Sequence, residues 1–333
     1  MSIVVVHADA FEAPEAYSIE RAVVEAAGGE FRLTRARSEA ELIANLARAD
    51  AVLVSAAPIT ATVAASLSAK VVVCYGVGLD TLDIPALSAA GIVVAHVPDF
   101  CQSEVANHTL ALLLACAKKL VPLDRAVRAG QWRAGPLGPM QHITDQTLGL
   151  VAYGNIAKAV AKRAAAFDLR VLAWDPYAQD FSGAEAVPTL AELLARSDFV
   201  SLHTPLTPET HHLINAETLA LMKPSAYLIN TARGPVVHEA ALVAALQAGT
   251  IAGAGLDVFE TEPLGGDSPL LSSGSVVLDN VVLLPHSASY SDRAFAGLRR
   301  RVAEAAIDVC VRNQWPEFPH NRAQLAATVS LGS

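Results

Sequence analysis

An arginine, a glutamate and a histidine each come shortly after an apolar segment of the sequence. Arg233, Glu262 and His286 follow the segments that end at residues 230, 257 and 284. A planar guanidinium can bind a carboxylate and the carbonyl beside it through two hydrogen bonds. A histidine can protonate a carbonyl oxygen, and a neighbouring carboxylate would orient its ring and raise its pKa. The three side chains therefore fit hydride transfer between a nicotinamide and a 2-oxo acid.

Each of these residues also has a simpler interpretation. Arg233 could be a surface loop arginine, and Glu262 could be an exposed loop acid. Most of the ten histidines are expected to be structural or solvated, as we expect for His211, His212 and His320. His203 is the main competitor of His286, because it also ends an apolar segment. Spacing alone leaves the choice between these two histidines open.

Residues 146–175 have the pattern of half a dinucleotide-binding unit. Two apolar segments flank a turn at Gly154 and an alanine-rich helix, and Asp175 lies 21 residues (175 − 154) after that glycine. A carboxylate at a spacing of about 20 binds the ribose hydroxyls of NAD. The glycine fingerprint falls on Ala152, Gly154 and Ala157, and alanine at the first position requires a turn with φ below zero. An ordinary strand, turn and helix is the alternative.

Apolar segments alternate with segments of helical period over most of the chain. This alternation predicts parallel, doubly wound sheets with helices on both faces. The expected strands are residues 3–6, 31–34, 51–55, 71–74, 92–95, 147–152, 170–174, 199–203, 226–230, 251–257 and 281–284. The expected helices are residues 14–27, 38–49, 60–68, 84–90, 103–120, 216–222, 239–248 and 292–313. Two α/β sheets in tandem follow, of which only the second contains a dinucleotide fingerprint.

Several connecting segments carry their own signals. Gly76 and Gly78 follow an expected strand, where backbone amides could bind a small anion or simply form a tight turn. Ser103 is expected to cap the helix over residues 103–120, and Pro122 to stop it. Residues 128–144 are rich in glycine and proline, which predicts a linker.

The last long helix, residues 292–313, is expected to lie on the surface. Its three consecutive arginines, Arg299 to Arg301, predict a solvated basic face. Residues 315–333 show no clear pattern.

Composition restricts the class of protein. A chain of 333 residues with 53% hydrophobic content is long enough for two folded domains. A net charge of −9 without a basic cluster argues against nucleic-acid binding. The four cysteines have no metal-ligand spacing and suit free thiols, and we expect no metal site. The N-terminal segment lacks a signal-peptide pattern and no segment could span a membrane, so we expect a cytoplasmic protein.

The sequence resembles the D-isomer-specific 2-hydroxyacid dehydrogenase family over nearly its whole length. Residues 197–236, SDFVSLHTPLTPETHHLINAETLALMKPSAYLINTARGPV, resemble the long signature of the family, and GLDVFETEP and LLPHSAS resemble the two segments after it. The resemblance implies an NAD-binding Rossmann domain, residues 99–286, inserted into a flavodoxin-like substrate domain, residues 1–98 plus 287–333. It also implies an active site in the cleft between the domains and a homodimer formed through the inserted domain.

The same resemblance implies roles for individual residues. Arg233 matches the substrate-binding arginine, His286 the acid/base, and Glu262 the carboxylate paired with it, which decides for His286 over His203. Matching cofactor-binding positions are Tyr153, Gly154, Asn155, Ile156, Asp175, His203, Thr204, Pro205, Thr210, Thr231, Ala232, Asp257 and His286. Matching substrate-binding positions are Tyr75, Gly76, Val77, Gly78, Arg233 and His286. Tyr75, Phe100, Met140 and Tyr290 are candidate pocket walls.

Within the family, AHVPDFCQSEVANHTLALLLACAKKL and HSASYSDRA most resemble the branch of the C-terminal-binding-protein corepressors and their bacterial dehydrogenase relatives. Cys74 replaces an arginine that is common in that branch, and Ser289 replaces the tryptophan of the corepressors. No arginine follows Asp175 to bind a 2′-phosphate, so NAD is favoured over NADP. We expect a dehydrogenase of small 2-oxo or 2-hydroxy acids. A dinucleotide-sensing protein with weak activity is the alternative, and an unusual donor such as phosphite is a more distant one.

Overall fold

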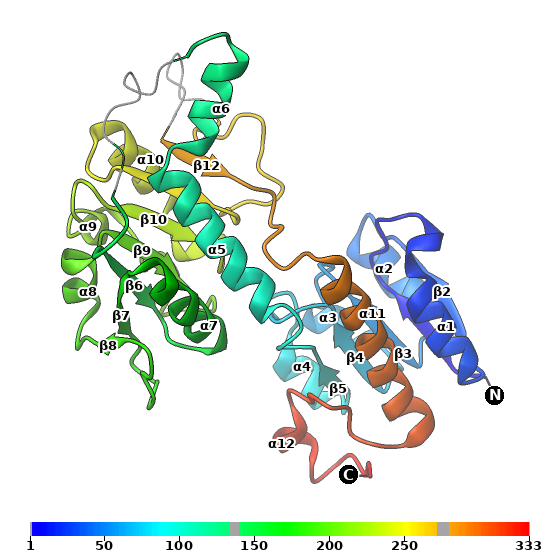
Figure 1. The fold of residues 1–333 in the computed structure, drawn as a ribbon. Helices are drawn as coiled ribbons and strands as arrows, with labels where there is room; N and C mark the ends of the chain where they lie inside the picture. The colour runs from blue at the N-terminus through cyan, green and yellow to red at the C-terminus, as the bar shows by residue number, and fades with distance from the viewer. Residues whose placement is uncertain (1, 133–139, 141, 272–279, 333) are drawn as a thin grey trace. The chain divides into compact units, whose positions relative to one another are not determined.

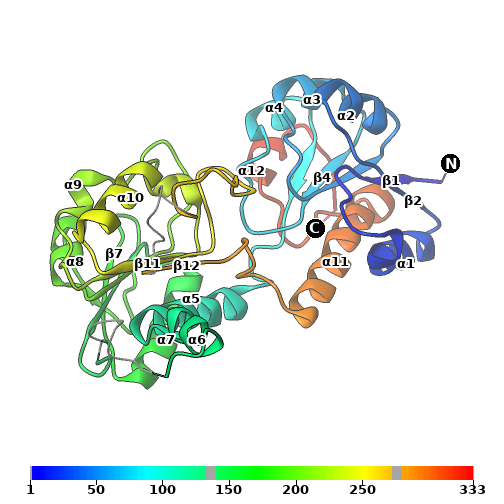
Figure 2. The same ribbon diagram turned by 90° about the horizontal axis from the view of Figure 1, so that it is seen from above.

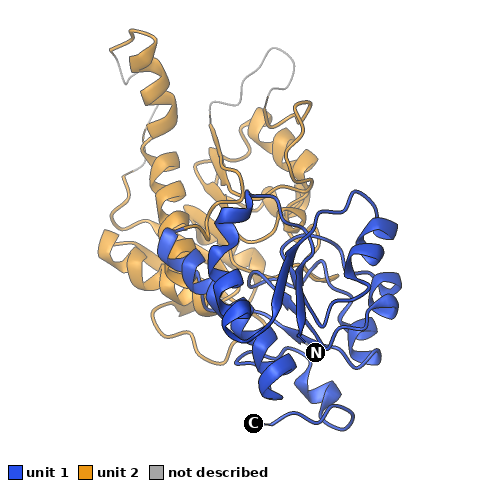
Figure 3. Cartoon of the chain, turned by 90° about the vertical axis from the view of Figure 1, so that its right-hand side faces the viewer, with its two compact units in different colours: residues 1–101, 291–333 blue, residues 102–290 orange. Residues whose placement is uncertain are grey.

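The computed structural model describes residues 2–132, 140, 142–271 and 280–332. The chain divides into two compact units, which are coloured separately in Figure 3. Unit 1 comprises residues 1–101 and 291–333, and unit 2 comprises residues 102–290. These boundaries fall a few residues after the expected ones. Residues 133–139 and 141 of the expected linker lie outside the described residues.

Unit 1 contains a parallel sheet of five strands in the order β2-β1-β3-β4-β5, the flavodoxin-like order. Its strands are β1 (Val4–His7), β2 (Glu30–Leu33), β3 (Ala51–Val54), β4 (Val71–Cys74) and β5 (Val93–Ala95). Its helices are α1 (Ser18–Ala26), α2 (Glu39–Leu46), α3 (Ala61–Ser66), α4 (Ile84–Ala89), α11 (Asp292–Ile307) and α12 (Arg322–Leu325), with short turns of helix at Pro14–Tyr17 and Asp308–Arg312.

Both faces of this sheet are buried, because alternate strand residues point to opposite sides. Val71 and Val73 pack with residues of α1 and α11, whereas Val72 and Cys74 pack with residues of α2, α3 and α4. Figure 2 shows these two helical layers on either side of the sheet. The continuous apolar strands of the sequence are explained by this double burial.

Unit 2 contains a sheet of seven parallel strands in the order β12-β11-β10-β9-β6-β7-β8. Its strands are β6 (Thr147–Val151), β7 (Arg170–Trp174), β8 (Glu185–Ala186), β9 (Phe199–Leu202), β10 (Tyr227–Asn230), β11 (Gly253–Leu256) and β12 (Val281–Leu283). Its helices are α5 (Gln102–Ala117), α6 (Leu120–Arg128), α7 (Asn155–Ala164), α8 (Leu190–Arg196), α9 (Ala216–Leu219) and α10 (Glu239–Ala248), with short turns of helix at Ala165–Phe167 and Gly234–Val236. This is the Rossmann order, which reverses between β6 and β9.

The helices of unit 2 form one layer on each face of the sheet (Figure 1). α5 and α7 pack on one face, where Leu113 and Val160 are fully buried, and α8, α9 and α10 pack on the other. The expected α/β class with two doubly wound sheets is confirmed. In the part of the chain that the structure describes, no helix is both long and apolar enough to cross a membrane.

The helix expected over residues 103–120 is in fact two helices. Lys119 has a φ of 51°, which breaks the chain between α5 and α6. Pro122 does not stop a helix but lies in the first turn of α6, where the missing N–H leaves no bond unmade. Ser103 does not cap α5, because it lies inside the helix and accepts a hydrogen bond from Arg163 at 2.8 Å.

The prediction of a solvated arginine face on the last helix holds for the exposed Arg300 but is wrong for Arg299 and Arg301. The side chain of Arg299 is only 14% exposed, where it pairs with Glu12 and lies 5.1 Å above the ring of Tyr17. Arg301 binds Asp99 at 2.7 Å and Glu317 at 2.9 Å. These arginines face neighbouring parts of unit 1, which local sequence pattern does not reveal.

Candidate active site

The candidate residues of unit 2 follow strands that end at one edge of its sheet. The strands are all parallel, so their carboxyl ends meet at this edge, which we call the carboxyl edge. Arg233 follows β10, Glu262 follows β11 and His286 follows β12. Parallel sheets bind ligands at this edge.

His286 and Glu262 form a direct hydrogen bond. The distance from His286 Nδ1 to Glu262 Oε2 is 2.7 Å. The second oxygen of Glu262 accepts the backbone N–H of Phe259 at 2.9 Å, which fixes the carboxylate. Since Nδ1 faces this carboxylate, Nε2 of His286 is the ring nitrogen left to face a reactant.

The charges in this group shift the pKa values of both partners. The hydrogen bond that His286 donates to Glu262 raises the pKa of His286 above its usual value, although burial and the positive charge of Arg233 oppose this. Burial by itself would raise the pKa of Glu262, but the hydrogen bonds from His286 and the Phe259 N–H bring it below its usual value. The pair therefore favours a protonated histidine beside an ionised carboxylate.

Two features hold the loop that carries Arg233. Asn230, the last residue of β10, is 1% exposed, and its side chain accepts the N–H of Ala232 and donates to the carbonyl of Arg233, both at 3.0 Å. Gly234 touches the next loop, since a Cβ there would lie 1.8 Å from the carbonyl oxygen of Phe259. Only glycine allows this approach, which connects the Arg233 loop to the Glu262 loop. The sequence prediction missed both residues.

A buried aspartate holds the backbone around His286. Asp257 is fully buried, and its carboxylate accepts the N–H groups of Ser287 and Ala288 at 2.9 and 2.8 Å. His286 itself has a φ of 52°, a conformation that costs about 1–2 kcal/mol for a residue with a side chain. The imidazole of His108, on α5, lies 3.4 Å from the same carboxylate, which is long for a hydrogen bond. The contact of Asp257 with a nicotinamide stays a prediction.

His203, the competing histidine, differs from His286. Burial lowers the pKa of His203 to about 4, so its ring is neutral at neutral pH. Its Nε2 lies 3.0 Å from the hydroxyl of Ser201, on β9, which ends one residue before His203. The pKa values of His203 and His286 are thus shifted in opposite directions.

The turn after β6 overturns one expectation from the fingerprint. Ala152 has a φ of 70°, so the account of this turn with φ below zero is wrong. Ala152 takes the left-handed conformation that glycine takes at the first fingerprint position, at a cost of about 1–2 kcal/mol. Tyr153 stacks on Phe181 at 5.5 Å and donates to the carbonyl of Ser182 at 2.8 Å. These contacts anchor the turn to the loop after β7.

The residues at the start of α7 fit a bound pyrophosphate. Among the described residues other than its two chain neighbours, no atom lies within 4 Å of the place where a Cβ of Gly154 would stand, which leaves open space at the helix N-terminus. Asn155 and Ile156 are the first residues of α7 and present N–H groups of its first turn. The site therefore fits a dinucleotide.

Asp175 comes directly after β7 and helps to shape this turn. Its carboxylate accepts the N–H groups of Tyr153 and Tyr177, both at 2.8 Å, and of Ala178 at 3.1 Å. An ionised Asp175 can still accept a hydrogen bond from a ribose hydroxyl, because a carboxylate has more acceptor positions than these three.

The other expected cofactor residues lie after β9 and β10. Thr204 and Thr210 both donate to the carbonyl of Pro205, at 3.2 and 2.7 Å, and form one compact turn. The hydroxyl of Thr231 lies 2.9 Å from that of Thr109 on α5. These contacts bring the predicted cofactor residues of unit 2 to its carboxyl edge.

The predicted substrate loop follows β4 in unit 1. The hydroxyl of Tyr75 donates to Glu20, which is fully buried, at 2.9 Å. Gly76 has a φ of 152°, which requires glycine. Cys74 is buried, with its sulfur 3.5 Å from the carbonyl oxygen of Gly78.

The other candidate pocket-wall residues, Phe100, Met140 and Tyr290, differ in how much they are packed or exposed. Phe100 packs edge-on against Phe295 at 6.1 Å in unit 1. In unit 2, Met140 and Tyr290 are exposed. Their part in a pocket stays a prediction.

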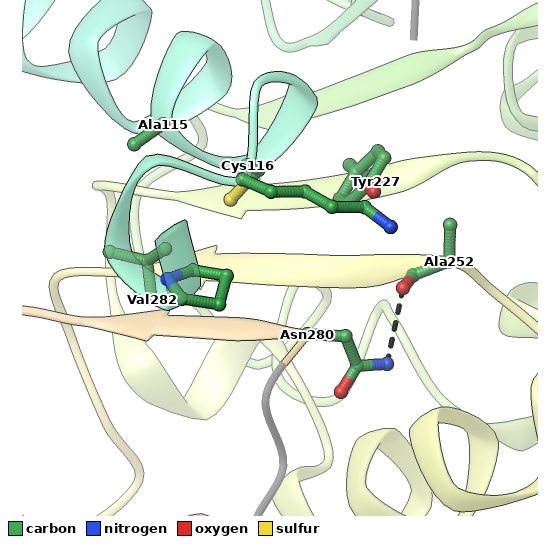
Figure 4. Close-up of a pocket in the computed structure, with 8 residues that line it drawn as sticks. Ala115, Cys116, Tyr227, Ala252, Asn280 and Val282 are labelled. Carbon is green, nitrogen blue, oxygen red and sulfur yellow. Dashed lines mark hydrogen bonds between the residues drawn. The ribbon is translucent and has the colours of Figure 1, made fainter. Parts of the chain in front are cut away.

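A cavity of about 130 Å³ lies at the opposite edge of the unit 2 sheet (Figure 4). Its walls include Cys116 at the end of α5, Tyr227 at the start of β10, and Ala252 and Asn280, which hydrogen-bond to each other at 3.1 Å. It belongs to the amino ends of the strands and not to the carboxyl edge. No group of side chains suited to a metal ion is found among the described residues.

The sequence is similar to one family of known proteins. Residues 110–288 match the sequence profile of the D-isomer specific 2-hydroxyacid dehydrogenase, NAD binding domain. A glyoxylate reductase of Korarchaeum cryptofilum is 43% identical over 76% of this chain and 75% of its own. A D-3-phosphoglycerate dehydrogenase of Methanocaldococcus jannaschii is 36% identical over 83% of this chain and 52% of its own.

A solved structure shares the fold of nearly the whole chain. The NADPH-dependent glyoxylate/hydroxypyruvate reductase of Sinorhizobium meliloti, in complex with NADP and malonate, has a TM-score of 0.84 at 29% identity, over 98% of each chain. The fold and the site are those of a dinucleotide-binding oxidoreductase. The chain belongs to the D-isomer-specific 2-hydroxyacid dehydrogenase family.

Proposed function

We propose that this chain is an NAD-dependent D-2-hydroxyacid dehydrogenase that interconverts a small 2-oxo acid and its 2-hydroxy acid. The observation that carries the proposal is the 2.7 Å hydrogen bond between His286 and Glu262, beside Arg233. A protein that only sensed dinucleotides would not need such an acid/base pair. The relatives named glyoxylate reductase support a short substrate such as glyoxylate.

Each residue has a part in the proposed reaction. The guanidinium of Arg233 binds the carboxylate and carbonyl of the substrate through two hydrogen bonds. The N–H groups of the Gly76–Gly78 loop are proposed to bind a substrate carboxylate. Protonated His286 gives its Nε2 proton to the carbonyl oxygen, and in the reverse direction the neutral ring accepts that proton. The nicotinamide, when bound, supplies or accepts the hydride at C2.

We propose NAD as the cofactor. Gly154 and the first N–H groups of α7 would hold the pyrophosphate, and Asp175 would bind the adenosine ribose. A carboxylate at that place repels a 2′-phosphate, and Pro176 and Tyr177 follow where NADP-binding proteins have an arginine. The Sinorhizobium meliloti relative takes NADPH, so both cofactors belong in the test.

We also propose a homodimer formed through unit 2. Leu120 and Val127 on α6 are apolar and more than half exposed, at 54% and 51%. A second copy of the chain that packed on α6 would bury them. A cytoplasmic location is supported by the cysteines, since all four lie in the described residues and form no disulfide.

The test is oxidation of NADH and NADPH with glyoxylate, hydroxypyruvate and pyruvate. We expect turnover with NADH, and a loss of about 10²- to 10⁴-fold in His286→Ala with NADH binding intact. His211→Ala, at an exposed histidine of the same unit, is the matched control and should keep full turnover. Wild-type turnover in His286→Ala would contradict the assignment, and NADH binding without any turnover by the wild-type chain would favour a dinucleotide sensor.

A further inference from the structure

The Gly76–Gly78 loop of unit 1 has two N–H groups that the described fold does not use. Within the described residues, the N–H groups of Val77 and Gly78 have no hydrogen-bond acceptor. Val77 is 37% exposed, so the loop is accessible. The direction of these N–H groups decides whether the loop can bind an anion.

Two residues directly after β5 fix this direction. The N–H of Val97 donates to the carbonyl of Gly76 at 3.3 Å. The Nδ1 atom of His96 lies 3.0 Å from the carbonyl oxygen of Val77. A carbonyl oxygen only accepts hydrogen bonds, so Nδ1 of His96 must be the protonated ring nitrogen.

The geometry of the peptide bond carries this constraint to the N–H groups. In a trans peptide the C=O and the following N–H point in opposite directions. With the carbonyls of Gly76 and Val77 held by residues 96 and 97, the N–H groups of Val77 and Gly78 point to the other side. Without the His96 bond, the peptide between Val77 and Gly78 is free to turn over, because glycine accepts either orientation.

His96 is itself held by the C-terminal part of the chain. Its backbone N–H donates to the carbonyl of Phe318 at 3.4 Å, and its ring lies edge-on to that of His320 at 5.7 Å. Asn321 is fully buried and accepts the N–H of Val94 at 2.9 Å. Residues 318–321 thus fix the end of β5, from which His96 reaches the loop.

We propose that His96 is a positioning residue that orients the Val77 and Gly78 N–H groups toward the carboxylate of the substrate. This inference rests on the proposed function, because it concerns the carboxylate of the 2-oxo acid. A carboxylate bound equally in the ground state and the transition state affects KM and not kcat. His96 therefore acts on KM for the 2-oxo acid and leaves kcat and NADH affinity unchanged.

The experiment compares His96→Leu with His96→Asn in the full chain. Leucine removes the donor, whereas Nδ2 of asparagine lies the same number of bonds from Cα as Nδ1 of histidine and can replace it. With glyoxylate as the varied substrate and saturating NADH, we expect KM to rise about tenfold in His96→Leu, with kcat within about twofold of wild type. His96→Asn should restore KM to near the wild-type value.

Ser88→Ala is the matched control for general loosening of unit 1. It removes the hydrogen bond from Asn321 to Ser88, at 2.9 Å, without touching the loop. It should lower the thermal midpoint slightly and leave KM unchanged. An unchanged KM in His96→Leu, or an equal rise of KM in His96→Leu and His96→Asn, would overturn this inference and leave the proposed function standing. Absence of wild-type turnover with glyoxylate, hydroxypyruvate and pyruvate would overturn the proposed function and the inference with it.

Discussion

His286 Nδ1 lies 2.7 Å from Glu262 Oε2, and this contact leaves Nε2 of the ring for the proton transfer proposed above. The carboxylate raises the pKa of His286, so the ring stays protonated to a higher pH than a solvated histidine. The pair therefore sets the pH range in which His286 can act as an acid.

Replacing Glu262 by glutamine should shift the pH dependence of 2-oxo acid reduction. In the proposed reaction, reduction needs protonated His286, so kcat/KM should fall as the pH rises through its raised pKa. Glutamine removes the negative charge, which lowers the pKa of His286, and the alkaline limb should move to lower pH. Measured pH profiles of the two proteins test this. An alkaline limb at the same pH in Glu262→Gln would show that another group controls it.

The same pair should make stability depend on pH. The raised pKa of His286 gives stabilisation that is present below its ordinary pKa of 6.5 and is lost as the pH rises through the raised value. The lowered pKa of Glu262 gives stabilisation that is present above its ordinary pKa of 4.5 and is lost as the pH falls through the lowered value. Between these limits, thermal midpoints of wild type and Glu262→Gln should differ most.

Gly234→Ala should impair catalysis without unfolding the protein. The new Cβ would lie 1.8 Å from the carbonyl oxygen of Phe259, so the loops that carry Arg233 and Glu262 must separate. A displacement of about 1 Å at reacting groups can cost about 10² in rate, and we expect kcat/KM to fall by that factor. Gly297→Ala is the control, since its Cβ meets open space among the described residues. Unchanged kcat/KM in Gly234→Ala would show that catalysis does not depend on the contact between the Arg233 loop and the Glu262 loop.

Ala152→Gly should stabilise the protein. Ala152 has a φ of 70°, and glycine relieves the strain of about 1–2 kcal/mol, of which each 1 kcal/mol corresponds to a rise in the thermal midpoint of about 2–4 °C. Ala157→Gly is the matched control, because Ala157 lies buried in α7. That change should lower the midpoint through the poor helix propensity of glycine. A lower midpoint in Ala152→Gly would refute the strain at this turn.

A charge on α6 should dissociate the proposed dimer. Val127→Glu replaces an exposed apolar side chain, which a second copy would bury, by a carboxylate. Burial of that charge in the interface is unfavourable. Light scattering should give the mass of a dimer for the wild type and of a monomer for this variant. Leu221→Glu, at another exposed apolar residue of unit 2, should leave the mass unchanged. A monomeric wild type, or a dimeric Val127→Glu protein, would show that α6 is not the interface.

The sequence alone determined most strands and longer helices and the order in which they occur, although it did not predict the short strand β8 or the helix α8. Apolar strands that alternate with helical segments are a local property, so the pattern of residues 71–74 or 199–203 was enough to predict buried parallel strands. The strand-end positions of Arg233, Glu262 and His286 followed from the same pattern, and resemblance to a family gave each its expected role.

Tertiary structure decided the contacts that hold these residues in place. Local periodicity does not encode four of these features. They are the left-handed turn at Ala152, the burial of Arg299, the contact of Gly234 with Phe259, and the hydrogen bond from His96 to Val77. Each depends on how distant parts of the chain pack, because packing alone can compensate a strained φ or bury a charged side chain. The sequence thus supplied the chemical groups, and the fold supplied their orientation.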